Sequence, residues 1–340
     1  MTILEIAGNV LLFALVFGMS ATVEFSSVEH QLQNKRAILV GCFCQFVLLP
    51  LLGYGVVEIL DLDAPLGVTL LVVVCSPGGS YSNWWCSLFN ADLALSVTMT
   101  AISTILSVIT LPANLLMYAN LAYEADVTSK LDWKSIFTAL VVVMSAIVLG
   151  IYVSARVHSL RFKLIANKLG NLAGFMLIAF SATVTNTGSA DTKIWSRDWS
   201  FYAACAVPCF LGLVLASILS SFFKLEPPER MTVGVECCYQ NIGVATSVAL
   251  TMFEGADLNN AMGIPFFYGV CEAIMVGAYA VGCWKCGWTK APADAPLWKV
   301  ISTSYEIVAA HGEEEVEALE HEYDESRAQQ RDETAYIEIG

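Results

Sequence analysis

One stretch decides the fold of this chain: Val233-Gly234-Val235-Glu236-Cys237-Cys238-Tyr239-Gln240-Asn241-Ile242-Gly243. It begins an apolar run between Arg230 and Glu254 in which Glu236 is the only charged residue. Gln240 follows four positions later and shares a face with Glu236 on a continuous helix. A carboxylate at membrane depth is costly and normally faces a cavity or a bound cation. Other parts of the chain must therefore supply the groups that neutralise Glu236.

The composition is that of a membrane protein. Of the 340 residues, 56% are apolar and 14% are charged, and the mean hydropathy is +0.64. A soluble chain would carry about 25% charged residues. The net charge is −14, but residues 291–340 hold 13 Asp and Glu against 3 Lys and Arg, a net of −10, which leaves −4 for residues 1–290. The acidity therefore belongs mostly to a tail, and an acidic membrane chain excludes a nucleic-acid partner in practice.

Nine stretches are long and apolar enough to cross a bilayer, which takes about 20 residues for each helix. They lie near residues 4–23, 36–60, 66–89, 93–120, 135–155, 168–187, 199–223, 231–253 and 262–283. The loops between them are too short for a soluble domain. We therefore expect an all-α polytopic membrane protein, with nine transmembrane helices in a transporter domain over residues 1–290. Residues 291–340 are expected to be an acidic and largely disordered tail.

Lys and Arg indicate the orientation of the chain. With the N-terminus outside, the cytoplasmic segments hold 11 of these residues and the outer loops hold 4. Cytoplasmic loops of membrane proteins carry this excess. We therefore expect the N-terminus outside and the C-terminus in the cytoplasm, with the plasma membrane as the location. The acidic tail then either solubilises the protein or binds a cytoplasmic partner.

Other chemistries have little support in the sequence. Most of the 11 cysteines lie within apolar runs, where cysteine is typically an inert core residue. Cys283-x-x-Cys286 has neither a second cysteine pair nor a nearby histidine. No nucleophile–base pair or cofactor loop is present, so we expect neither an enzyme nor a cofactor, apart from a coupling ion.

The third span is not an ordinary helix. Cys75-Ser76-Pro77-Gly78-Gly79-Ser80-Tyr81-Ser82-Asn83 places a proline and two glycines near the middle of the membrane. Proline removes a backbone donor and clashes with the preceding turn. Unwound backbone at this depth is tolerated only where it is buried or lines a wet cavity. The alternatives are a functional break and a kinked helix that simply packs on its neighbours.

Polar side chains in two other spans face the same region. Ser96 and Thr100 are four residues apart, so both hydroxyls can face the broken span, although such residues often bond their own helix instead. Asp92 opens the fourth span, where an acid suits the helix dipole and a simple cap is the plainest role. Gln45 lies five residues before Pro50, and a lone buried glutamine is usually a helix–helix hydrogen bond.

Two oxygen-rich stretches, residues 78–83 and 236–241, lie in comparable positions in the two halves of the membrane region. This pattern is typical of an inverted-repeat transporter in which two discontinuous helices cross near the midplane. One carboxylate with several neutral oxygens suits a monovalent cation such as Na⁺, because tight Ca²⁺ or Mg²⁺ sites usually gather more carboxylates. The rival is H⁺, since a glutamate can also protonate.

Four motifs, at residues 45–50, 75–83, 95–100 and 236–241, together resemble those of the bile acid:sodium symporter family, solute carrier family 10. The family patterns are Gln-Phe-x-x-x-Pro, Cys-Ser/Cys-Pro-Gly-Gly-x-x-Ser-Asn, Leu-Ser-x-x-x-Thr and Glu-x-x-x-Gln-Asn. The resemblance covers roughly residues 8–285, and the nine spans are similar to those of animal-type members.

The resemblance implies two Na⁺ sites that share Glu236. The first would use the side chains of Ser82, Asn83, Ser96, Thr100 and Glu236. The second would use Gln45, Glu236 and Gln240, with carbonyl oxygens near Cys237 and Tyr239. Substrate would lie beside the crossing, near Gly79, Ser80 and Asn241. Asp92, in the loop Asn90-Ala91-Asp92, is a weaker candidate.

The resemblance also implies a fold and a function. A panel domain, with spans near residues 4–23 and 135–187, would move against a core domain, with spans near 36–120 and 199–283. The implied activity is Na⁺-coupled symport of an organic anion, such as a bile acid, a steroid conjugate or a small carboxylate, by alternating access. The alternative is a non-transporting or sensory membrane protein that signals through its acidic tail. Trp84-Trp85 departs from the family pattern, and these residues either narrow the cavity or pack against lipid.

Overall fold

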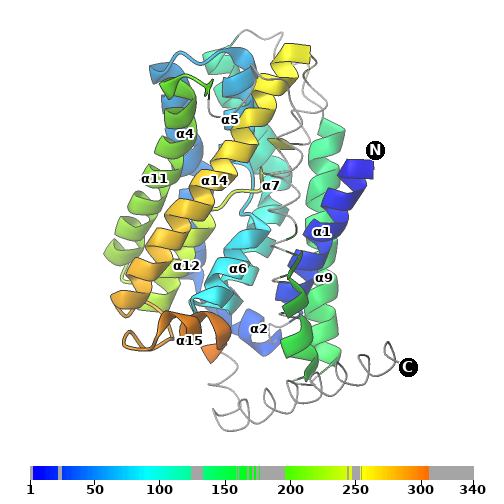
Figure 1. Ribbon diagram of the computed structural model, residues 1–340, viewed down its shortest axis with the longest axis vertical. Coiled ribbons are helices and arrows are strands. Elements are labelled where there is room, and N and C mark those ends of the chain that lie inside the picture. The colour runs from blue at the N-terminus through cyan, green and yellow to red at the C-terminus, as the bar shows by residue number, and fades with distance from the viewer. Residues whose placement is uncertain are drawn as a thin grey trace, which may run out of the picture.

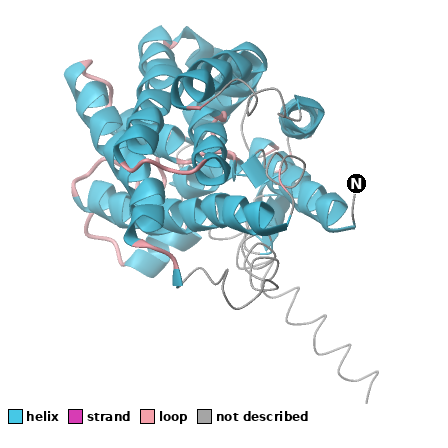
Figure 2. Ribbon diagram, turned by 90° about the horizontal axis from the view of Figure 1, so that it is seen from above, coloured by secondary structure: helices cyan, strands magenta, loops and turns pink. Residues whose placement is uncertain are grey.

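The computed structural model describes most of the chain. Its main stretches are residues 3–21, 25–123, 133–157, 196–242 and 255–305, with shorter pieces at 159, 161–166, 168–170, 172–173, 176, 245–246 and 253. Within these residues the regular structure is helical, joined by short loops (Figure 2). The one β feature described there is an isolated antiparallel bridge between Gly78 and Gln240.

The helices follow the expected spans closely. They are α1 (Ile3–Ser20), α2 (Phe25–Gln33), α3 (Lys35–Phe43), η1 (Cys44–Leu48), α4 (Leu49–Ile59), α5 (Ala64–Cys75), α6 (Ser80–Leu88), α7 (Leu93–Ala122), α9 (Trp133–Arg156), α11 (Trp199–Phe222), α12 (Pro227–Cys238), α14 (Gly255–Lys285) and α15 (Leu297–Ser302). Four described helices are long and apolar enough to cross a membrane: Lys35–Ile59, Leu93–Ala122, Trp199–Phe222 and Asn260–Lys285. The protein is therefore a helical, multi-pass membrane protein, as the sequence predicts. The count of nine spans stays a prediction, because much of residues 168–187 and 243–254 lies outside the described residues.

The helices form two groups in space. Figure 1 shows α1 and α9 side by side at one edge of the molecule, and these two helices pack mainly on each other. Helices α4 and α11 lie at the opposite edge, α14 runs obliquely across the front of the molecule, and α6 and α7 lie between the groups (Figure 1). The grouping agrees with a division into panel and core, although that division and its inverted repeat stay predictions.

The third span is interrupted rather than simply kinked. Helix α5 ends at Cys75, α6 begins at Ser80, and both Ser76 and Gly79 have extended backbone. Helix α12 ends at Cys238 and is followed by Tyr239, whose backbone is also extended.

The two breaks meet and satisfy each other's backbone groups. The amide of Gly79 donates to the carbonyl oxygen of Tyr239 at 2.8 Å, and the amide of Asn241 donates to that of Pro77 at 3.1 Å. Because lipid offers no hydrogen bonds, this mutual pairing is what permits unwound backbone at such depth. The two segments are thereby held in a fixed register.

Glycine is required at the break because the chains approach so closely. A Cβ atom at Gly79 would overlap the backbone carbonyl of Gln240. A Cβ atom at Gly78 would lie 2.8 Å from Oε2 of Glu236, closer than real Cβ contacts. The Gly-Gly pair therefore lets both the second backbone and the buried carboxylate come near.

Gln45 lies in η1, a π-helical turn between α3 and α4. Turns of this kind are frequent at functional sites. Pro50, at the start of α4, has no amide to offer the carbonyl oxygen of Phe46 four residues earlier. Nδ2 of Asn114 from α7 donates to that oxygen at 2.9 Å instead. The irregular turn that presents Gln45 is thus fixed by a side chain from a distant helix.

The folded part extends beyond the expected domain boundary at residue 290. Helix α15 packs against α6, and Val300 is fully buried. Asn90 fastens this segment, because its Nδ2 donates to the carbonyl oxygen of Val300 at 2.9 Å and its Oδ1 accepts from the amide of Tyr305 at 2.7 Å. Residues 291–305 therefore belong to the folded protein, and the predicted acidic tail over 306–340 lies outside the described residues.

Candidate ion-binding site

Glu236 lies on the last turn of α12, directly before the break, and only 2% of it is exposed. Its Oε1 accepts hydrogen bonds from the hydroxyls of Ser82 at 2.7 Å and Thr100 at 3.3 Å, and a further short one from Ser96. Its Oε2 accepts from Thr100 at 3.2 Å. These partners come from α6 and α7, so two other helices place oxygen atoms around the carboxylate of α12.

Asn83 completes this group. Its Oδ1 accepts hydrogen bonds from Ser96 at 2.8 Å and from Thr100 at 3.3 Å. The five side chains predicted for the first Na⁺ site are therefore brought together in the buried interior. A hydroxyl that donates to a carboxylate keeps its lone pairs, and all five side chains offer hard oxygen atoms that suit an alkali cation.

Gln45 and Gln240 meet beside this group. Nε2 of Gln45 donates to Oε1 of Gln240 at 2.6 Å and to the carbonyl oxygen of Ser76 at 2.7 Å. Nε2 of Gln240 donates to the carbonyl oxygen of Cys237 at 2.7 Å, while the carbonyl oxygen of Tyr239 accepts the amide of Gly79. The two glutamines predicted for the second site are thus in contact, and the two predicted carbonyls lie at the same crossing.

A small cavity joins the two groups of predicted ligands. Its volume is about 10 Å³, close to the least space that holds one water molecule. Its lining residues are Ile38, Gly41, Cys42, Gln45, Met99, Ile102, Ser103 and Glu236. Glu236 and Gln45 therefore line one small space between α3, η1, α7 and α12.

The predicted substrate residues lie at the bridge itself. Gly79 and Asn241 are the residues whose amides pair the two breaks. Nδ2 of Asn241 is buried and has no hydrogen-bond partner in the described structure, so this amide is available to a ligand. The side chain of Ser80 lies outside the described residues.

Asp92 caps a helix, the plainest role that its position suggested. Its Oδ1 accepts the amide of Leu95 at 2.9 Å, at the start of α7. Its Oδ2 accepts Nε2 of Gln31 at 2.8 Å, which ties α2 to this helix start. The contacts of its carboxylate are therefore those of a cap that also joins two helices.

The aromatic residues after the break pack inside the protein. The rings of Tyr81 and Tyr239 lie 5.7 Å apart, and those of Trp84 and Trp85 lie 4.9 Å apart. Trp84 is buried, so of the two alternatives packing against lipid is excluded for this residue. Trp85 lies against Gly277 of α14.

Glu272 of α14 was not among the residues predicted from the sequence. It is fully buried, and its Oε1 accepts the backbone amide of Gln240 at 2.6 Å. Its Oε2 is buried without a hydrogen-bond partner in the described structure. A signal for it was present, because Glu272 is the only charged residue between Asp257 and Lys285. The reasoning that singled out Glu236 applies equally to this second lone acid.

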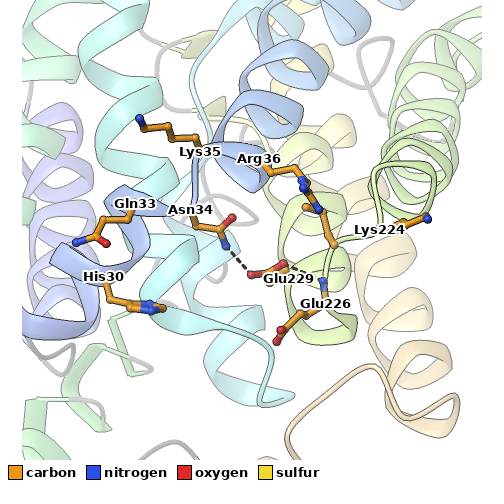
Figure 3. A pocket seen from close by; sticks show the side chains of 9 residues that line it. His30, Gln33, Asn34, Lys35, Arg36, Lys224, Glu226 and Glu229 are labelled. Carbon is orange, nitrogen blue, oxygen red and sulfur yellow. Dashed lines mark hydrogen bonds between the residues drawn. The ribbon is translucent and has the colours of Figure 1, made fainter.

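A separate and larger cavity, of about 630 Å³, lies where α2 meets α3 and α11 meets α12 (Figure 3). Its lining residues are His30, Gln33, Asn34, Lys35, Arg36, Lys224, Leu225, Glu226 and Glu229. Figure 3 shows Asn34 and Glu229 pointing toward each other, and a hydrogen bond joins them. This cavity contains none of the predicted ligands, so its size does not mark the ion site.

Broken helices that meet at buried oxygen ligands are typical of ion-coupled secondary transporters. The chain belongs to the sodium bile acid symporter family, whose model matches residues 9–193. The resemblance seen in the four sequence motifs is thereby confirmed. The family is one of sodium symporters rather than of enzymes.

Relatives match across most of the chain. The hepatic sodium/bile acid cotransporter of Rattus norvegicus is 27% identical over 265 residues, which cover 77% of this chain and 72% of the relative. The ileal sodium/bile acid cotransporter of Cricetulus griseus is 28% identical over 282 residues, which cover 82% of this chain and 79% of the relative. The sodium-dependent organic anion transporter of Bos taurus is 26% identical over 270 residues, which cover 78% of this chain and 70% of the relative.

Proposed function

We propose that this chain is a Na⁺-coupled symporter of an organic anion that works by alternating access. The observation that carries the proposal is the group of oxygen ligands around Glu236 at the meeting point of two broken helices. The names of the relatives support both the Na⁺ coupling and the organic anion as substrate. Two of these relatives are sodium/bile acid cotransporters, and one is a sodium-dependent organic anion transporter. We further propose the plasma membrane, with the N-terminus outside.

Na⁺ suits this site better than H⁺. A glutamate with few neighbours is neutralised by a proton, but Glu236 has hydroxyl oxygens from three side chains within hydrogen-bond distance. Ser82, Ser96, Thr100, Asn83 and Glu236 form the first proposed Na⁺ site. Gln45, Gln240 and Glu236 form the second, with the carbonyl oxygens of Cys237 and Tyr239.

Coupling follows from the position of the bridge between the two breaks. The amides of Gly79 and Asn241 fix the register of the crossing, and both residues adjoin the proposed Na⁺ ligand Gln240. Na⁺ draws α6, α7 and α12 together, and this fixes the crossing in the form that holds the anion beside Asn241. Substrate then binds tightly only to the Na⁺-loaded state, which is the thermodynamic content of coupling.

The movement that exposes the site to each side in turn is proposed to occur between the two helix groups. Helices α1 and α9 belong to the panel, and the helices that carry the ion ligands belong to the core. Because every proposed Na⁺ ligand lies in the core, the ion site can move as one unit. The nine-span topology and the inverted repeat are parts of the same proposal.

The decisive experiment is uptake into proteoliposomes that contain the purified full chain. An inward Na⁺ gradient is compared with an equal K⁺ gradient, for a set of labelled bile acids, steroid sulfates and small carboxylates. We expect uptake of at least one of these anions that depends on Na⁺. Saturable anion binding without uptake would contradict symport and would favour a sensory membrane protein of the same fold.

A further inference from the structure

The crossing contains two buried carboxylates, although the proposed Na⁺ sites use only one. Glu272 lies near the middle of α14 and is completely buried. Its Oε1 accepts the backbone amide of Gln240 at 2.6 Å, so it contacts the residue whose side chain belongs to the second proposed Na⁺ site. Its Oε2 has no hydrogen-bond partner in the described structure. A buried carboxylate with an unpaired oxygen needs a compensating interaction, because an unpaired buried charge is costly.

Among the described residues, the groups around Glu272 do not provide that compensation. Its near neighbours are Cys209 of α11 and Cys238 of α12, with Tyr268 one helical turn earlier on α14. These side chains carry no positive charge at neutral pH. The hydroxyl of Tyr268 is likewise buried without a hydrogen-bond partner in the described structure. The polar atoms on this side of the crossing therefore leave the carboxylate unbalanced.

The charge of the proposed ion centre is unbalanced in the opposite sense. Before the substrate anion binds, two Na⁺ ions that share Glu236 alone would leave one excess positive charge in the membrane interior. A second carboxylate at the same crossing makes the loaded centre neutral. Glu272 is in the right place for this, because a single hydrogen bond separates it from Gln240, which in turn contacts Gln45.

Resting on the Na⁺ coupling proposed above, we propose that Glu272 is the second anionic group of this cation centre. It positions Gln240 through the backbone amide, and its charge strengthens the binding of the Na⁺ ion held between Gln45 and Gln240. The centre of this chain therefore pairs two carboxylates with two cations. Glu272 acts on the ion through Gln240 and through its field, as a positioning residue.

The test measures Na⁺ binding to the purified full chain in nanodiscs by calorimetry, which needs no transport. Glu272→Gln removes the charge but keeps an oxygen that accepts the amide of Gln240. We expect this variant to bind Na⁺ about tenfold more weakly, or to lose one of two ions. Its melting temperature without Na⁺ should equal or exceed that of the wild type, because the structural hydrogen bond is kept and an unpaired buried charge is removed. Glu58→Gln, which removes an exposed acid at the end of α4, is the matched control.

A second variant separates charge from shape. Glu272→Asp keeps the charge but withdraws the oxygens by one methylene, so we expect it to retain more Na⁺ affinity than Glu272→Gln. The reverse order, or equal Na⁺ affinity in the wild type and Glu272→Gln, would overturn the proposal. If Glu236→Gln loses Na⁺ binding while Glu272→Gln does not, only this inference fails. If the wild type binds Na⁺ but takes up no anion, symport fails and the role of Glu272 is still decided by the binding data.

Discussion

At the scale of single residues, the chemistry centres on a buried carboxylate and the hydroxyls around it. Glu236 accepts from Ser82, Ser96 and Thr100, so its charge is met by three dipoles that come from two other helices. Such dipoles reduce the cost of burial without cancelling the charge, because each hydroxyl remains neutral. In the proposed Na⁺ site a bound cation completes the balance, so each ligand can be tested by substitution.

Glu236→Ala is expected to reduce uptake to the level seen without a Na⁺ gradient. The change removes the one charged ligand and leaves Asn83 and three hydroxyls with no acid to hold a cation. Uptake in proteoliposomes is the measurement, with the amount of protein in the membrane determined in parallel and Glu58→Gln as the control. If Na⁺-driven uptake by the Glu236→Ala variant equals that of the wild type, the proposed site is disproved.

Thr100→Val tests a neutral ligand without changing the shape of the side chain much. Its hydroxyl contacts both oxygens of Glu236, so its loss should raise the Na⁺ concentration for half-maximal uptake by about tenfold. Thr110→Val is the matched control on the same helix, because the Thr110 hydroxyl donates to the carbonyl oxygen of Leu106 in its own helix. Equal Na⁺ dependence in the two variants would contradict a ligand role for Thr100.

At the scale of elements, the two helix breaks matter more than any whole helix. The break between α5 and α6 and the one after α12 share two backbone hydrogen bonds, and neither break is satisfied alone. Every proposed ligand lies within about a turn or two of a break, or on α7 and η1 beside it. The ion site therefore depends on the register of this pairing.

Gly79→Ala is expected to abolish Na⁺-dependent uptake and to lower the melting temperature. The added Cβ would overlap the Gln240 carbonyl, and backbone at the bridge cannot move aside without losing its hydrogen bonds. Gly55→Ala is the control within α4, where an added Cβ meets nothing within 4 Å. That control should be neutral or more stable by about 1 kcal/mol, since Ala favours helix over Gly. A Gly79→Ala variant with normal uptake would show that the two breaks are less closely packed than described.

Asn114→Leu tests the π-helical turn that presents Gln45. The carbonyl oxygen of Phe46 loses its donor, and a buried unsatisfied group costs about 1–3 kcal/mol. We expect a lower melting temperature together with weaker Na⁺ dependence, because Gln45 is displaced along with the turn. A loss of stability with unchanged Na⁺ affinity would separate the turn from the ion site.

At the scale of the whole molecule, the core is closed at one end by the segment after α14. Val300 is buried, and Asn90 holds both Val300 and Tyr305 by hydrogen bonds from the loop between α6 and α7. This loop joins the two helices that carry four of the five ligands of the first site. The segment over residues 286–305 thus supports the ion site from a distance.

Two truncations distinguish this segment from the acidic tail. Removal of residues 306–340 should leave Na⁺-driven uptake intact, whereas removal of 291–340 should lower the melting temperature and reduce uptake. Thermal unfolding and proteoliposome uptake are measured on both. Loss of uptake in the shorter truncation would instead assign a transport role to the acidic tail.

The sequence by itself determined the apolar helices and the break, and its resemblance to a family supplied the proposed list of ligands. Apolar runs of membrane length specify helices because lipid satisfies no backbone group, and Pro77 with Gly78 and Gly79 stops one of them for local steric reasons. The motifs around Glu236 and Ser96 named the oxygen atoms of the site. The helices and the break are local properties of the chain, whereas the proposed ligands follow from the motifs of its family.

Only the tertiary structure decided which of these atoms meet. The pairing of Gly79 with Tyr239, the contact of Gln45 with Gln240 and the approach of Glu272 each join helices that are far apart in the sequence. Glu272 shows the difference most clearly, because the sequence displays a lone acid in an apolar span but not the amide that it contacts. Helix formation is governed by neighbours along the chain, whereas the convergence of ligands depends on long-range packing, which no single span encodes.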